Sequence, residues 1–221
     1  MTSPEQTRIV AVWDLPTRLF HWLTVALVLA AYATWRLNRM DWHAAIGQAL
    51  LALVLFRLFW GVAGSDTARF ARFLASPRAA IRHLAGLFAG EPDEQVGHNA
   101  AGGWMVVLLL ALLLGETLTG IVSNNDVASE GPLTERLPGW LLNLIDDLHG
   151  WIWTALLTAV VLHVAAIGFY AVRGHRLVPA MATGRKALPA HTPAPRMAPT
   201  WRALPILAAA VVAAALIANR L

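Results

Sequence analysis

Long apolar runs alternate with short polar stretches along the chain. Each run is close to the ~20 residues that a helix needs to cross about 30 Å of hydrocarbon, and none shows the short alternating segments of a transmembrane barrel. The pattern predicts five transmembrane helices, which cover roughly residues 19–36, 42–62, 102–123, 146–172 and 203–219. The predicted fold class is therefore an all-α membrane protein.

Two segments between the runs have other patterns. The stretch SPRAAIRHLAGLFAG, residues 76–90, opens with a Ser-Pro helix-entry signal and carries apolar residues at helical spacing. It predicts a short amphipathic helix on the membrane surface, to which we expect His83 to belong. The stretch 184–200 holds four prolines and predicts an extended linker, with His191 as a loop residue. The expected organisation is a membrane domain over residues 10–187, a Pro-rich linker over 188–202 and an additional transmembrane helix over 203–221.

Composition supports this class and restricts the chemistry. Apolar residues make up 57% of the chain and charged residues 14%, whereas about a quarter of a typical soluble domain is charged. The chain has no cysteine, which excludes disulfides, thiolate-bound metals, cysteine-ligated iron–sulfur clusters and covalently attached haem. Any resident redox centre would therefore depend on histidine, of which there are eight.

The charge balance of +4 reflects membrane orientation rather than nucleic-acid binding, because the basic residues lie beside the predicted helices. With a cytoplasmic N-terminus, twelve Lys and Arg residues fall on the cytoplasmic side and four on the opposite side. This bias predicts that orientation. The outer loop 124–147 is acidic, with Asp126, Glu130, Glu135, Asp146 and Asp147.

Four histidines fall at two depths of the predicted membrane. His149 and His163 lie fourteen residues apart in one predicted helix, a rise of about 21 Å that returns to within roughly 40° of the same face. His43 matches the outer level of His149, and His21 matches the inner level of His163. The spacing predicts two histidine pairs, stacked across the bilayer inside a four-helix bundle.

Such pairs fit the axial ligands of six-coordinate haem iron, which transfers electrons because no coordination position is open. A zinc site would need four ligands at one place. Small residues near the histidines would leave room for a flat macrocycle: Ala44, Ala45, Gly47, Gly150, Ala165, Ala166 and Gly168. Two alternatives stay open, namely a proton relay in a haem-free transporter and polar contacts between helices in a non-redox membrane anchor or assembly subunit.

Six motifs carry a resemblance to a known family: VWDLPTRLFHW, DWHAAIGQALLALVLFRLFWGVAGSDTARF, GHNAAGGWMVVLLLALLLGETLTG, GPL, LHGWIWTALLTAVVLHVAA and LVPAMATGRK. Over about residues 10–187 the chain resembles the bacterial cytochrome b561 family, and more narrowly the b-type cytochrome subunits of nickel–iron hydrogenases. The resemblance implies four core helices and two non-covalent haems b in the bacterial inner membrane. It also implies an electron path between a quinone pool and a partner redox protein, within a complex.

Carried over by position, the resemblance pairs His21 with His163 at an inner haem and His43 with His149 at an outer haem. It places His98 of GHNAAGG at the inner side, where the hydrogenase relatives are thought to bind quinone. Two features depart from the family. Ala100 stands where the motif usually has proline, and the fifth helix has no counterpart in the four-helix members. The second departure leaves open a different partner or an assembly role.

Three further polar residues stand out. Arg18 lies three residues before His21, on the same helix face, and would either pair with a haem propionate or anchor the helix. Arg57 would either reach the surface or meet a propionate. Glu116, inside the third predicted helix, would be a protonated, hydrogen-bonded carboxyl, or would serve a proton relay or an outer quinone. We expect a hydrogenase-like enzyme or a c-type cytochrome to dock beside the acidic outer loop.

Overall fold

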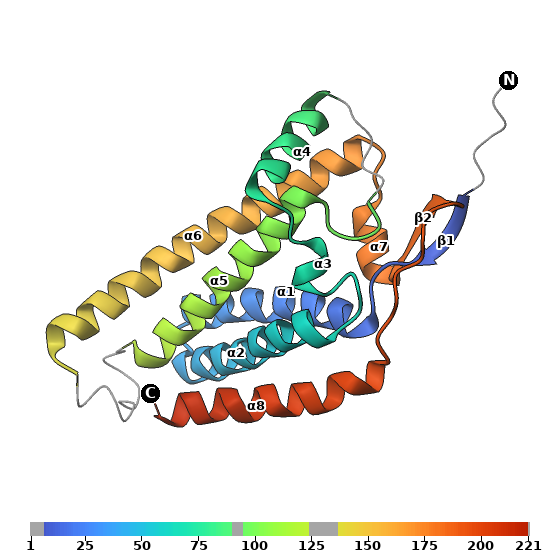
Figure 1. Ribbon diagram of the computed structural model, residues 1–221. Coiled ribbons are helices and arrows are strands. Elements are labelled where there is room, and N and C mark those ends of the chain that lie inside the picture. The colour runs from blue at the N-terminus through green and yellow to red at the C-terminus, as the bar shows by residue number, and fades with distance from the viewer. Residues whose placement is uncertain (1–6, 90–94, 124–136, 221) are drawn as a thin grey trace, which may run out of the picture. The chain divides into compact units, whose positions relative to one another are not determined.

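The computed structural model describes residues 7–89, 95–123 and 137–220. Five of its helices are long and apolar enough to cross a membrane. They are α1 (Leu15–Arg36), α2 (Met40–Ala63), α5 (Ala100–Val122), α6 (Gly139–Val172) and α8 (Ala203–Arg220). The predicted all-α membrane fold and its five transmembrane helices are therefore confirmed (Figure 1). At 34 residues, α6 is about 51 Å long and exceeds the hydrocarbon thickness.

The remaining elements are short. They are β1 (Thr7–Ala11), α3 (Phe70–Phe73), α4 (Pro77–Ala89), α7 (Leu177–Thr183), β2 (Arg185–Pro189) and the 3-10 helix η2 (Thr200–Arg202). The helix α4 corresponds to the predicted amphipathic helix. The acidic residues Asp126, Glu130 and Glu135, and the GPL motif at 131–133, lie outside the described residues.

The described chain divides into two compact units. Unit 1 comprises residues 1–19, 59–107 and 162–203, and unit 2 comprises residues 20–58, 108–161 and 204–221. The helices α1, α2, α5 and α6 each have one part in each unit, whereas α8 lies in unit 2 from Leu204 onward.

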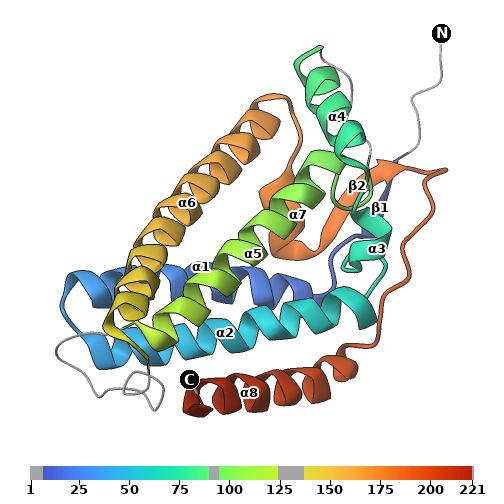
Figure 2. The same ribbon diagram turned by 60° about the vertical axis from the view of Figure 1, so that its left-hand side comes forward.

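Unit 1 contains a two-stranded antiparallel sheet that the sequence did not predict. β1 pairs with β2 in the register Thr7↔Pro189 to Ala11↔Arg185 (Figure 2). Val10 and Leu188 are buried together with Val12 and Ala180 in a small hydrophobic cluster. The part of the predicted linker at 185–189 is therefore a strand, held by backbone hydrogen bonds and by this cluster.

Gly184 joins α7 to β2 and requires glycine. Its φ of +79° is left-handed, and a Cβ there would lie 2.7 Å from the Trp13 carbonyl oxygen. The Gly184 carbonyl accepts hydrogen bonds from the backbone N–H groups of Val12 (2.8 Å) and Trp13 (3.1 Å). This turn fastens the chain before α1 to the chain after α7.

Asp14 fixes the start of α1 within unit 1. It is buried, and its Oδ1 accepts a hydrogen bond from the Thr17 backbone N–H at 2.8 Å, as expected for a residue that caps a helix. Its Oδ2 accepts a second bond from Trp60 Nε1 at 3.1 Å. The carboxylate therefore joins the first turn of α1 to the last turns of α2.

The predicted linker beyond β2 is docked onto the turn that follows α2. The backbone of Asp66 donates to the Arg196 carbonyl at 3.0 Å, and the Arg196 N–H donates to Asp66 Oδ2 at 3.0 Å. The Ala198 N–H donates to Ser65 Oγ at 2.9 Å. The bond from Arg196, with help from the charges of Arg69 and Arg72, holds the pKa of Asp66 below its usual range.

Unit 2 packs parts of all five long helices. Val54 of α2, Leu113 of α5 and Leu156 of α6 are buried together in one apolar cluster, and the Tyr32 ring of α1 stacks on Trp153 of α6 with ring centroids 5.7 Å apart. In both views α8 lies beside α2 (Figures 1 and 2). Its Ala214 is buried against Leu51 and Ala52.

Candidate functional site

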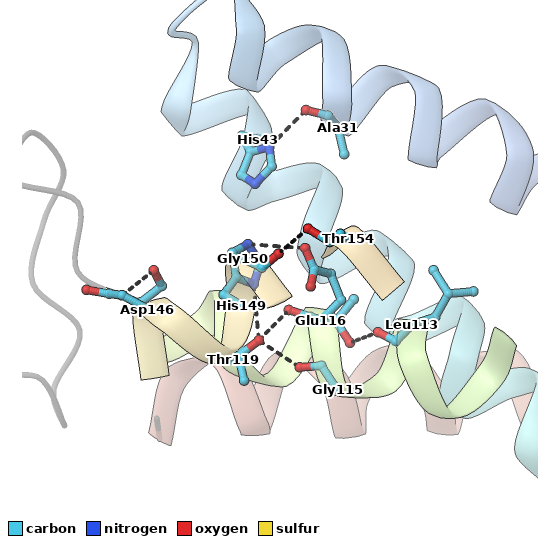
Figure 3. Close-up of polar contacts among 12 residues, drawn as sticks. Ala31, His43, Leu113, Gly115, Glu116, Thr119, Asp146, His149, Gly150 and Thr154 are labelled. Carbon is cyan, nitrogen blue, oxygen red and sulfur yellow. Dashed lines mark hydrogen bonds and ion pairs between the residues drawn. The ribbon is translucent and has the colours of Figure 1, made fainter. Parts of the chain in front are cut away.

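His43 of α2 and His149 of α6 both lie in unit 2, and Figure 3 shows them on facing helices; their pairing as haem ligands stays a prediction. The ring of His43 is directed toward the side of α6 from which His149 projects. Both side chains are half-buried.

A backbone hydrogen bond fixes the tautomer of His43. Its Nδ1 lies 2.9 Å from the carbonyl oxygen of Ala31 on α1. Because a carbonyl can only accept, Nδ1 carries the proton and donates it. The other ring nitrogen, Nε2, therefore keeps its lone pair, which is the form of imidazole that binds a metal.

A hydroxyl fixes the tautomer of His149 in the same sense. Thr119 Oγ1 donates its proton to the backbone carbonyls of Gly115 (2.8 Å) and Glu116 (3.1 Å), four and three residues earlier on α5. The same oxygen lies 3.1 Å from His149 Nδ1, and with its proton already committed it accepts there. His149 Nδ1 is therefore the donor, and Nε2 again keeps the lone pair.

Glycines provide the space around these rings. A Cβ on Gly120 would lie 3.0 Å from His149 Cε1, so only glycine lets the ring lie this close to α5. A Cβ on Gly47, one turn after His43, or on Gly150 would meet nothing within 4 Å. Both positions had been identified from the sequence as space for a macrocycle.

These observations fit a haem held by two imidazoles. Metal-binding histidines characteristically donate their second ring N–H to a carbonyl or another fixed acceptor, which orients the ring and raises its basicity. Both histidines do so here, and open space adjoins both. Within residues 7–89, 95–123 and 137–220 no group of three or more His, Cys, Asp or Glu side chains could hold a metal ion, but an axial pair needs only two.

Glu116 belongs to the same cluster. Its Oε1 lies 3.4 Å from His149 Nε2, and its Oε2 is buried with no hydrogen-bond partner among the described residues. Since Nε2 and the carboxylate are both acceptors, their contact requires one proton between them. A haem iron would bind the same lone pair of His149 Nε2 that a protonated Glu116 would otherwise donate to. The sequence identified both Glu116 and His149 as unusual polar residues, but it did not show that their side chains lie side by side.

The residues of the predicted inner pair lie in different units. His21 lies on the part of α1 that belongs to unit 2, with its ring 4.8 Å from that of Trp22, while His163 lies on the part of α6 that belongs to unit 1. Their pairing stays a prediction. His149 and His163 do lie on the single uninterrupted helix α6, which keeps the predicted rise of about 21 Å between them.

The two arginines proposed for haem propionates have defined surroundings. Arg18 donates a hydrogen bond to the carbonyl oxygen of Ala182, at the end of α7 in unit 1. Arg57 in unit 2 is 2% exposed, so its guanidinium is enclosed by protein and does not extend along the helix to the surface. The propionate role remains a prediction for both.

His98 lies among aromatic rings in unit 1. Its ring centroid is 4.6 Å from the ring centroid of Trp13 and 4.6 Å from that of Phe73. Asn99 follows it and caps α5, since its Oδ1 accepts the Gly102 N–H at 2.7 Å. Ala100 is then the first residue of α5, a position that favours proline but does not require it. The departure from the family motif therefore preserves the start of this helix.

His83, which the sequence assigned to the surface of the amphipathic helix, is half-buried and has a polar partner that the sequence did not show. Its Nε2 lies 2.9 Å from the hydroxyl of Tyr170, which is 7% exposed. Sequence reasoning also missed Thr119 and Tyr170 as polar partners of histidines. No periodicity identifies them, because each contact joins helices that are distant in the sequence.

Thr119→Val tests the hydroxyl that positions His149. Valine preserves the shape but cannot accept the Nδ1 proton, so the imidazole becomes a less basic ligand. We expect the midpoint potential of the outer haem to rise, and its retention to weaken by roughly 10- to 100-fold, the usual effect of removing such a partner. Potentiometric titration followed by haem absorbance measures both changes.

Thr117→Val is the matched control for this variant. The Thr117 hydroxyl donates to the Leu113 and Leu114 carbonyls of the same helix, so this variant changes the helix similarly. Equal potentials in the two variants would contradict the role given to Thr119.

The family model described as prokaryotic cytochrome b561 matches residues 12–184. No curated protein matches the chain. The matched region includes His21, His43, His98, His149 and His163, and it ends before the docked linker and α8.

Proposed function

The chain belongs to the prokaryotic cytochrome b561 family, whose members transfer electrons in the membrane through haem b, and on that premise we propose that it connects a quinone pool to a partner redox protein through two haems. His43 and His149 would hold the outer haem, and His21 and His163 the inner one. When bound, each haem supplies a one-electron carrier. The protein supplies the ligands, their orientation and the surroundings that set the potential.

The observation that carries this proposal is the matched state of His43 and His149. Each Nδ1 donates to a fixed acceptor on a neighbouring helix, Ala31 O on α1 or Thr119 Oγ1 on α5. In this tautomer each Nε2 carries a lone pair, although His149 Nε2 also lies 3.4 Å from Glu116 Oε1. Two imidazoles that served only as polar contacts between helices would have no reason to share this tautomer next to open space at Gly47 and Gly150.

The surroundings of His98 support the quinone part of the proposal. A flat head group would find the rings of Trp13 and Phe73 beside His98, and hydrogen-bonding groups on His98 and Asn99. We place the quinone there, on the side that the basic residues predict to be cytoplasmic. A hydrogenase-like enzyme or a c-type cytochrome would bind on the opposite, periplasmic side, within a complex in the inner membrane.

Purified full-length chain tests this function. We expect a reduced b-type absorbance spectrum, about two haems per chain by pyridine haemochrome assay, and reduction of the haem by menadiol. His98→Ala should slow reduction by menadiol while leaving reduction by dithionite unchanged. A folded but colourless protein would instead favour the membrane anchor, and a coloured protein that menadiol does not reduce would contradict the quinone assignment.

A further inference from the structure

A chain of three polar side chains in unit 1 joins the start of α5 to α4. Asn99 Nδ2 donates to the Tyr170 hydroxyl oxygen at 2.6 Å, and that oxygen lies 2.9 Å from His83 Nε2. Asn99 is 8% exposed and Tyr170 is 7% exposed. Three separate segments therefore place hydrogen-bonding groups in contact inside a region of low polarity, an arrangement that is costly unless each group is satisfied.

The direction of these bonds follows from their chemistry. An amide nitrogen can only donate, so the Tyr170 oxygen accepts from Asn99. In the His83 tautomer that carries its proton on Nδ1, Nε2 accepts the Tyr170 hydroxyl proton. The hydroxyl is therefore oriented away from Asn99 and toward α4.

His83 connects this buried hydroxyl to the exposed side of α4. It is half-buried, whereas its neighbours Ile81 and Arg82 are exposed. Imidazole can hold a proton on either nitrogen and exchanges protons with water near neutral pH. A proton received at Nε2 can therefore leave from Nδ1.

We propose that Tyr170 and His83 form a proton path between a quinone at His98 and Asn99 and the water beside α4. This inference rests on the quinone function proposed above. Oxidation of a quinol releases two electrons and two protons, and a bound haem would take up the electrons one at a time. The path carries a quinol proton to the Tyr170 oxygen while Tyr170 passes its own proton to His83 Nε2, and the Nδ1 proton goes to water. Quinone reduction follows the same path in reverse.

The path predicts that His83 controls the pH dependence of turnover with quinol. The other charged or titratable groups on the parts of these elements that belong to unit 1 are Arg78 and Arg82 on α4, His98 ahead of α5, His163 on α6, and Arg173, His175 and Arg176 after α6; the His175 ring lies 5.8 Å from that of Tyr170. The arginines stay charged across the physiological range. A change in the pH profile that follows substitution of His83 alone therefore identifies this imidazole.

The test uses purified, haem-loaded full chain with menadiol as the quinol. Tyr170→Phe and His83→Ala should each slow reduction of the haem by menadiol, on the order of 100-fold for loss of a positioned proton-transfer group, and should alter the pH profile. Reduction by dithionite, which needs no quinol proton path, should stay at the wild-type rate. Imidazole added to the buffer should restore part of the rate of His83→Ala and leave the wild type unchanged.

Two matched controls belong to this test. Tyr32→Phe changes the other tyrosine of the chain, which lies in unit 2, and His191→Ala changes a histidine beyond β2; both should behave as the wild type. The proton path alone would be overturned if both Tyr170→Phe and His83→Ala reacted with menadiol at the wild-type rate. It would also be overturned if His83→Ala were slow but kept the wild-type pH profile and did not respond to imidazole. A wild type that menadiol does not reduce would remove the proposed quinone function, and the path with it.

Discussion

Replacing His43 with alanine should lower the haem content from about two per chain to about one. The His43 ring faces the side of α6 that carries His149, and it is oriented by the Ala31 carbonyl at 2.9 Å. Alanine offers no ligand, and a non-covalent haem with one axial imidazole loses half of its attachment to the protein. The inner haem, which we assign to His21 and His163, should remain. Pyridine haemochrome assay gives the count, and potentiometric titration should show one component in place of two.

His149→Ala should give the same single-haem protein, and the double variant His43→Ala/His149→Ala should lose no further haem. His21→Ala and His163→Ala should remove the other component. His191→Ala, a change in the loop beyond β2, serves as the control and should keep both haems. Retention of two haems by His43→Ala would contradict the assignment, and so would a double variant that loses both.

The long helices were predictable because they depend on a local pattern. Apolar runs of about 20 residues identify spans from composition alone. The angle of 100° per residue decides whether two histidines of one helix share a face, and α6 is continuous through both His149 and His163. The pairing of His43 with His149 rests on their predicted depth near the same predicted surface, and it stays a prediction.

The hydrogen bonds that orient these histidines were not predictable in the same way. The partner of His43 is a backbone carbonyl on α1, and a carbonyl leaves no mark on the sequence. The partner of His149 is Thr119, one of several threonines whose hydroxyls bond back to their own helix. Only the packing of α5 against α6 distinguishes Thr119 from Thr117, and that packing is a non-local property.

The sheet of unit 1 was missed for a related reason. β1 and β2 are five residues each and lie far apart in the sequence. Each is too short to show a clear alternation, and the prolines after β2 favoured a linker. Helical periodicity places His83 on α4, but periodicity does not show that Tyr170 of another helix reaches it. In each case a non-local contact overrode the local pattern.

Ala214→Leu should destabilise unit 2, because α8 approaches α2 through small residues. Ala210 and Ala214, one turn apart on α8, are 0% and 3% exposed, and Ala214 is buried with Leu51 and Ala52. Small residues let helices pack closely in a membrane. Leucine at this contact must displace α8 or distort α2, at a cost of about 1–3 kcal/mol. We expect a lower midpoint for unfolding in denaturant, measured by loss of tryptophan fluorescence and of haem absorbance.

Ala215→Leu is the matched control, because Ala215 is exposed and the same enlargement there should leave the midpoint unchanged. The cluster around Ala214 also contains Leu118 and Ile121 of α5, which flank Thr119, the residue that orients His149. Ala214→Leu should therefore release the outer haem before the inner one as denaturant rises, even though α8 lies beyond the matched region 12–184. If both haems were lost at the same denaturant concentration, α8 would stabilise the whole protein and not the outer haem in particular. An unchanged unfolding midpoint in Ala214→Leu would contradict the packing of α8 against α2.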